Sequence, residues 1–307
     1  MADRGSDNLV FDVGDSYERE RAARYCERMR AEDEQRRHED MEIQARTAYL
    51  RMRLGDHYIR SGKIERAIAE YRRAVKMDGN NAVFRTRLGD TFVMKEMVQQ
   101  AMTQYRHAIR SDPGLADPRV SLGDLYRRFG MNVQALEQYQ IAVDLEPTRA
   151  YYRFKLADAL AATGKTAEAM EEYQALVRLA PNDAFYQFRH GDLCLRLGRT
   201  REAVDRFGQA VRLAPCDGYY LVRYGVLSLA VGRIVEAVDA LRAALKLDPR
   251  NRCYRVLLAD AYAEAGLEEE AAELLTQAGE LDSYEMEFVG RRRLELNRAE
   301  MDAAGAA

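Results

Sequence analysis

Residues 116–149 read ADPRVSLGDLYRRFGMNVQALEQYQIAVDLEPTR. From Val120 to Tyr126 the apolar residues recur at intervals that place them on one face of a helix. Gly130 then interrupts the pattern, and a second apolar face begins at Ala135. The segment therefore predicts two helices joined by a tight turn, where glycine adopts a left-handed backbone at the least steric cost.

The same pattern recurs every 34 residues on both sides of this segment. Seven residue pairs keep that spacing: Leu54-Gly55, Leu88-Gly89, Leu122-Gly123, Leu156-Ala157, His190-Gly191, Tyr224-Gly225 and Leu258-Ala259. Seven alanines keep it as well: Ala67, Ala101, Ala135, Ala169, Ala203, Ala237 and Ala271. A fixed period of this size indicates helical hairpins that bury their apolar faces only by stacking on their neighbours. The sequence thus predicts an all-α solenoid.

Composition and charge narrow the classes of function. The 307-residue chain is 47% hydrophobic and 32% charged, with a formal net charge of -3, so a polyanion is a poor candidate partner. The amino terminus has no apolar core of signal-peptide length, and no segment is long and apolar enough to span a bilayer. We therefore expect a cytoplasmic protein.

Cysteine and histidine show no pattern typical of a metal site or an active site. The four cysteines include no C-x-x-C pair and none neighbours a histidine in sequence: Cys26, Cys194, Cys216 and Cys253. No histidine lies in a catalytic motif, and His190 stands in a column filled mainly by leucine, so we expect it to be a satisfied core residue. We expect no catalytic residue, no metal, no cofactor and no enzyme activity.

The repeated columns resemble the tetratricopeptide repeat. That family combines a leucine-glycine pair, an aromatic residue three positions later, a glycine turn, an alanine, an aromatic residue, a further alanine and a terminal proline. Glu96 departs from the pattern because it replaces a turn glycine. The resemblance implies a right-handed α-solenoid of helix-turn-helix units over residues 48–285. Its seven units are 48–81, 82–115, 116–149, 150–183, 184–217, 218–251 and 252–285.

Both ends of the array carry additional segments. We expect a charged helix over residues 16–47 and a polar-backed capping helix over 286–301, with disordered tails at 1–15 and 302–307. In the capping helix we expect the apolar residues to face the array: Phe288, Val289, Leu294 and Leu296. We expect its arginine triplet to face solvent: Arg291, Arg292 and Arg293.

The resemblance also indicates where a partner would bind. In similar proteins the first helices line a concave face, and positions two, five and nine of each unit point into it. In units four to six those positions include Tyr151, Phe154, Asp158, Phe185, Phe188, Asp192, Tyr219 and Val222. Aromatic side chains at repeat spacing favour a groove for an extended or helical peptide. For any single residue the alternative of packing between adjacent repeats stays open.

Aspartate recurs at the ninth position of most units. We expect basic residues three positions earlier to neutralise it: Arg53, Arg87, Lys155 and Arg189. Pairing with basic residues of a partner is the alternative. Repeat domains that grip acidic chaperone tails carry a lysine, asparagine and arginine clamp at positions five and nine, whereas this chain has Met52, Thr86, Val120 and aspartates. An acidic C-terminal tail is therefore not the expected ligand.

The favoured function is a non-catalytic scaffold or adaptor that holds a segment of a partner protein by apolar anchors. An alternative is that an apolar N-terminal run enters a groove, either of another copy, which gives a homo-oligomer, or of the same copy, where it would be autoinhibitory. The run comprises Leu9, Val10, Phe11 and Val13. Nucleic-acid recognition by a helical repeat is less favoured, because it requires basic and stacking residues in register.

Overall fold

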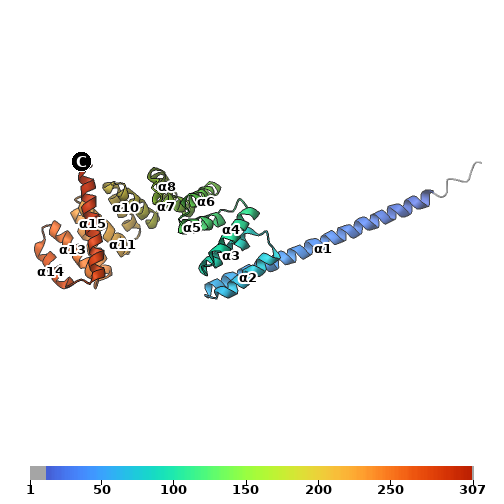
Figure 1. The fold of residues 1–307 in the computed structure, drawn as a ribbon, viewed down its shortest axis with the longest axis horizontal. Coiled ribbons are helices and arrows are strands. Elements are labelled where there is room, and N and C mark those ends of the chain that lie inside the picture. The colour runs from blue at the N-terminus through green and yellow to red at the C-terminus, as the bar shows by residue number, and fades with distance from the viewer. Residues whose placement is uncertain (1–11, 306–307) are drawn as a thin grey trace, which may run out of the picture. The chain divides into compact units, whose positions relative to one another are not determined.

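The computed structural model describes residues 12–305, with side chains described for residues 27–302. Over that range the chain forms fifteen α-helices and no strand (Figure 1), which confirms the all-α prediction. The contacts divide it into two compact units, Met1–Ser121 and Leu122–Ala307. The helices are α1 (Asp12–Arg60), α2 (Ile64–Met77), α3 (Ala82–Met94), α4 (Val98–Ser111), α5 (Asp117–Arg128), α6 (Asn132–Leu145), α7 (Ala150–Ala162), α8 (Thr166–Leu179), α9 (Ala184–Arg196), α10 (Thr200–Leu213), α11 (Gly218–Ala230), α12 (Ile234–Leu247), α13 (Arg252–Glu264), α14 (Glu268–Ala278) and α15 (Ser283–Gly305).

The first helix, α1, is longer than the sequence pattern predicts. It runs without a break from Asp12 to Arg60 because no proline interrupts those residues. The charged helix predicted over 16–47 and the first helix of the first repeat are therefore one element. Residues 12–15 of the predicted disordered tail belong to α1, and the rest of that tail lies outside the described residues.

In the first, second, third and fifth hairpins a glycine of the first helix allows a ring of the second helix to lie directly against it. A Cβ on Gly55 would lie 2.6 Å from Cε1 of Tyr71. The hydroxyl of Tyr71 donates to Asp56 Oδ1 over 2.6 Å. The same arrangement recurs at Gly89 with Tyr105, and at Gly123 with Tyr139. The glycine and aromatic columns of the sequence are thus a single packing contact repeated along the chain.

The boundaries of the hairpins follow from local chemistry. Four of the first helices begin at a side chain that accepts the backbone N–H three residues later: Asn81, Asp183, Asp217 and Asn251. The turn to the second helix passes through a left-handed residue, such as Gly198 at φ 71°. In the part of the chain that the structure describes, no helix has the length and apolarity of a membrane span.

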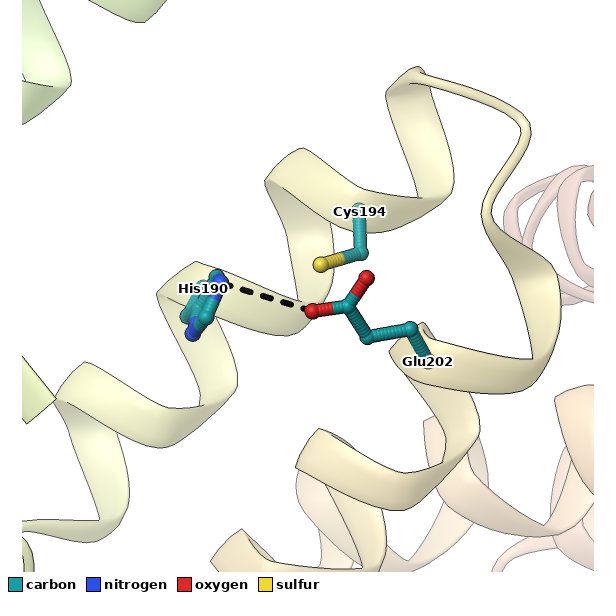
Figure 2. Close-up of side chains that lie close together, drawn as sticks. All are labelled: His190, Cys194 and Glu202. Atoms are coloured by element: carbon teal, nitrogen blue, oxygen red, sulfur yellow. Dashed lines mark ion pairs between the residues drawn. The ribbon is translucent and has the colours of Figure 1, made fainter. Parts of the chain in front are cut away.

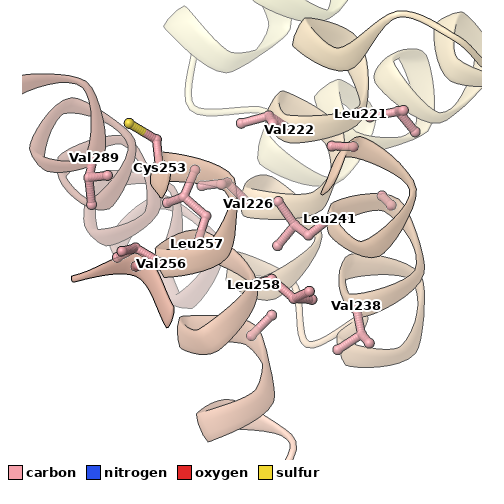
Figure 3. Close-up of a cluster of buried hydrophobic side chains, with 14 residues drawn as sticks. Leu221, Val222, Val226, Val238, Leu241, Cys253, Val256, Leu257, Leu258 and Val289 are labelled. Atoms are coloured by element: carbon pink, nitrogen blue, oxygen red, sulfur yellow. The ribbon is translucent and has the colours of Figure 1, made fainter. Parts of the chain in front are cut away.

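The last helix, α15, packs against three earlier helices of its unit, α10, α11 and α13. Its residue Val289 is buried in a core cluster with side chains of α11 and α13 (Figure 3). Near its other end, Thr200 Oγ1 donates to the carbonyl of Ala299 over 3.3 Å. The helix begins before the predicted 286–301 and extends beyond it, so residues 302–305 of the predicted disordered tail are helical.

Two expectations about the faces of α15 are wrong. Leu294 was expected to face the array, but it is exposed. Arg292 was expected to face solvent, but its side chain is only 15% exposed and pairs with Glu295 over 2.5 Å. Arg291 and Arg293 are exposed as expected, although Arg293 also pairs with Asp260 over 2.7 Å.

Candidate functional site

Three aromatic side chains on α7, α9 and α11 remain exposed at the same position of successive repeats. Tyr151, Phe185 and Tyr219 are each the second residue of their helix, and they are 46%, 44% and 46% exposed. We call these three residues the aromatic row. Exposed apolar side chains that form a contiguous patch mark a candidate interaction surface, whereas single ones are ordinary protein surface.

Two of the predicted residues at the fifth position, Phe154 and Phe188, pack against rings of the aromatic row. The ring of Phe154 lies 5.1 Å from that of Phe185 in an edge-to-face arrangement, and Phe154 is half-buried. The ring of Phe188 lies 5.4 Å from that of Tyr219. Each exposed ring of α9 and α11 therefore rests on an aromatic side chain from the preceding repeat, which restricts its motion.

Two of the predicted residues belong to the core. Phe188 is only 4% exposed and stacks on Tyr220 with a centroid distance of 4.5 Å. Val222 lies among the buried side chains of the cluster drawn in Figure 3. Phe188 and Val222 therefore pack between helices, which is the alternative to lining the groove. A partner could not contact them without displacing other side chains.

The predicted aspartates are engaged within the protein. Asp158 accepts from Arg189, and Asp192 accepts from Arg223 over 3.0 Å. The same pairing joins Lys155 to Asp124 over 2.8 Å. Each cation thus lies 31 residues after its aspartate, in the next repeat, rather than at the expected three residues before it. The charges of these aspartates are thus neutralised within the protein, but mainly by cations of the following repeat. Pairing within a repeat occurs as well, since Arg189 lies 3.9 Å from Asp192, three residues later.

An arginine-rich pocket of about 750 Å³ lies between α9, α11 and α15. Six arginines and three acidic residues line it: Arg189, Arg196, Arg223, Arg291, Arg292, Arg298, Asp192, Glu295 and Asp302. Three of those arginines have a buried Nε without a hydrogen-bond partner among the described residues: Arg189, Arg223 and Arg292. The pocket is therefore electropositive, and its charge would attract an acidic group.

Arg223 is the buried centre of this pocket. It pairs with Glu295 of α15 over 2.5 Å and lies over the rings of Phe188 and Tyr219. Burial alone would lower the pKa of Arg223, but the carboxylates of Glu295 and Asp192 outweigh it and raise the pKa overall. Sequence patterns missed this pocket because they do not place α15 beside α9 and α11. The only feature of the sequence that pointed to it was the arginine triplet of residues 291–293.

A second group of side chains could hold a metal ion. His190 and Cys194 of α9 and Glu202 of α10 offer ligand atoms that all lie within 4.8 Å of one another (Figure 2). The Sδ atom of Met170, from α8, lies 3.2 Å from His190 Nε2. Burial lowers the pKa of His190 to about 4 and raises the pKa of Cys194 to about 12.

His190 is buried in the core as expected, but it is not satisfied there. Its Nδ1 has no hydrogen-bond partner among the described residues, and its Nε2 reaches only a thioether and a carboxylate oxygen at 4.0 Å. The ring stacks on Tyr173 with centroids 6.1 Å apart. No sequence motif indicated this group, because its members come from two helices, α9 and α10, whose side chains meet only through packing.

Comparison with known proteins identifies the repeat. A family model described as tetratricopeptide repeat matches residues 52–116, 120–184 and 188–252, and a second model of that description matches 228–283. No curated protein gives a significant match.

Solved structures with low sequence identity share the fold. One is PilF of Pseudomonas aeruginosa, 20% identical with a TM-score of 0.59, covering 72% of this chain and 99% of that chain. Another is a tetratricopeptide repeat protein of Parabacteroides merdae, 14% identical with a TM-score of 0.55, covering 81% and 99%. A third is YrrB, described as having an unusual peptide-binding site, 19% identical with a TM-score of 0.51, covering 63% and 96%. At these identities the comparisons show the fold alone.

Proposed function

Because the chain belongs to the tetratricopeptide repeat family, we propose that it is a non-catalytic scaffold or adaptor that holds a segment of a partner protein on α7, α9 and α11. Repeats of this family generally mediate protein–protein interactions. The observation that carries the proposal is the aromatic row, whose three rings stay exposed at the same position of consecutive repeats. Phe154 completes the contact surface, and Phe188 supports it from within.

The partner segment that fits this face combines apolar and acidic side chains. Because each ring is already about half-buried, covering it would contribute about 1 kcal/mol before the cost of ordering the segment, so the three rings would act together. The arginine-rich pocket lies beside Tyr219, whose ring is 5.7 Å from the guanidinium of Arg292. Its positive charge favours carboxylates at the end of the segment that reaches α11.

The helix α15 supports a helical form for this segment. It is itself a helix that packs on α11 and α13 through an apolar residue, Val289, while Glu295 pairs with Arg223. The same chemistry, an apolar stripe with an acidic residue beside it, would dock a partner helix on the neighbouring part of the face. YrrB, which shares the fold, is described as having a peptide-binding site.

The test compares two double variants of the full chain in a pull-down followed by mass spectrometry. Tyr151→Ser with Phe185→Ser removes two rings of the aromatic row. Val133→Ser with Val235→Ser is the matched control, because those two side chains are also exposed and apolar but belong to second helices, α6 and α12. We expect the first variant to lose a partner that the wild type and the control both retain, with unchanged circular dichroism. Equal recovery by all three proteins would refute the proposed surface.

A further inference from the structure

We propose that His190, Cys194 and Glu202 form a binding site for a single zinc ion in the fifth repeat. The imidazole, thiolate and carboxylate are the three ligand types that zinc takes from proteins. The thioether of Met170 lies beside this set, 3.2 Å from His190 Nε2. Three protein ligands would leave the fourth position of a tetrahedral ion to water, as in zinc sites with an open position. The site is distinct from the aromatic row and does not depend on a partner protein.

The geometry allows tetrahedral coordination after a small side-chain movement. His190 and Cys194 are four residues apart on α9, so they project from the same face of that helix. Bonds of about 2.0 to 2.3 Å place the ligand atoms of a tetrahedral zinc ion about 3.5 Å apart. The present separations are all within 4.8 Å and so exceed this by about 1.3 Å at most. Glu202 can rotate to shorten them because its side chain is 37% exposed.

The repeat register shows that two packing positions changed together in this unit. The position of His190 holds leucine in five of the seven units: Leu54, Leu88, Leu122, Leu156 and Leu258. The position of Cys194 holds an aromatic residue in four of them: Tyr58, Phe92, Tyr126 and Tyr262. Only the fifth unit replaces both with metal-binding residues. Burying an imidazole whose nitrogen contacts only a thioether costs free energy that a leucine at this position would not cost. Coordination of a metal ion by the imidazole would explain why histidine is present here.

The charges of the site balance when zinc is bound. On binding, zinc(II) displaces the proton of the Cys194 thiol, and this proton passes to solvent along the partly exposed side of Glu202. The S⁻–Zn bond that forms involves no oxidation. One thiolate and one carboxylate then neutralise the two positive charges of the ion, while the imidazole stays neutral. A neutral complex is compatible with the buried surroundings of His190 and Cys194, which are fully inaccessible to solvent.

Zinc content of the full chain tests the proposal. The protein is stripped with a chelator, incubated with zinc chloride, desalted and measured for zinc by mass spectrometry, and cobalt(II) is used as a spectroscopic probe of a thiolate bond. We expect one zinc ion per chain, a sulfur-to-cobalt charge-transfer band, and a higher melting temperature with zinc. Cys194→Ser, His190→Leu and Glu202→Gln should each weaken zinc binding by at least about 100-fold, since each removes a direct ligand.

Two control variants make the result specific. Glu236→Gln changes the residue that holds the position of Glu202 in the next repeat, and Cys216→Ser removes an exposed cysteine outside the site. Both should bind zinc like the wild type. His190→Leu restores the usual residue of its column, so retained helicity in that variant separates loss of zinc from loss of fold. Absence of zinc from the wild type, or equal zinc content in wild type and Cys194→Ser, overturns the proposal.

Discussion

Glu96 occupies a backbone conformation that the other repeats give to glycine. Its φ of 59° makes it the one non-glycine residue with positive φ in the described part of the chain, and the turn between α3 and α4 nevertheless keeps its hydrogen bonds. The N–H of Met97 donates to the carbonyl of Phe92 over 2.9 Å, as the N–H of Met131 does to Tyr126 in the next repeat. The packing of the hairpin thus imposes the turn, and Glu96 bears the strain.

Replacing Glu96 with glycine should stabilise the protein. Relief of the left-handed strain outweighs the extra entropy of glycine in the unfolded chain, so we expect a gain of about 0.5 to 1 kcal/mol in the free energy of unfolding. Gly130→Ala is the matched change at the same turn position, where φ is 72° and the space beside the residue is open. It should destabilise by a similar amount. Urea denaturation measures both, and a loss of stability in Glu96→Gly would contradict the account.

Among the helices, α15 differs from the others because it contacts elements far from it in sequence. It covers Cys253 of α13, whose Sγ lies 3.8 Å from the carbonyl of Glu285. Cys253 holds the same second position that Tyr151, Phe185 and Tyr219 hold in earlier repeats. The helix α15 therefore covers, in the seventh repeat, the position that the aromatic row holds in the fourth to sixth repeats. The three residues of the aromatic row stay exposed.

A charge at Val289 should detach α15 from the array. Val289 is buried between α11 and α13, so the carboxylate of Val289→Asp would have no partner there and the helix would leave the surface. Cys253 would then react with a thiol reagent at least about tenfold faster, because its protection depends on α15. Peptide mapping locates the label. Val235→Asp, at an exposed site on α12, should leave the rate unchanged; an unchanged rate in Val289→Asp would show that α15 does not protect Cys253.

At the level of the whole chain, stability arises from contacts between consecutive helices. Pairs such as α9 with α10 and α10 with α11 recur through the unit Leu122–Ala307. In an array of this kind each repeat is stabilised mainly by its immediate neighbours. Removal of repeats from one end should therefore leave the remaining ones folded.

A fragment of residues 116–307 should fold and bind zinc. It keeps α5 complete and contains α9 and α10, which supply the three proposed zinc ligands, and α8, which supplies the neighbouring Met170. We expect the helix content per residue of the full chain and the same zinc stoichiometry. The melting temperature should be lower, by about 2 to 4 °C for each kcal/mol lost at the exposed end. Circular dichroism and zinc analysis measure these quantities, and an unfolded fragment would show that the repeats are not independent of the removed part.

Much of the fold could be predicted from the amino-acid sequence, because the hairpins are stabilised by contacts that repeat every 34 residues. The columns that begin at Gly55 and Tyr71 reflect one local contact between adjacent helices, and local contacts leave a periodic trace. The exposed rings of the candidate site, Tyr151, Phe185 and Tyr219, could be located from the same period.

Other features depend on how distant segments meet. Thr200 bonds to Ala299, 99 residues away, and no periodic pattern predicts a contact that occurs once. The same reason explains why the exposure of Leu294, the burial of Phe188 and the convergence of His190 with Glu202 required the tertiary structure. Burial and coordination depend on neighbours in space, whereas a repeat pattern reports only the neighbours that every unit shares.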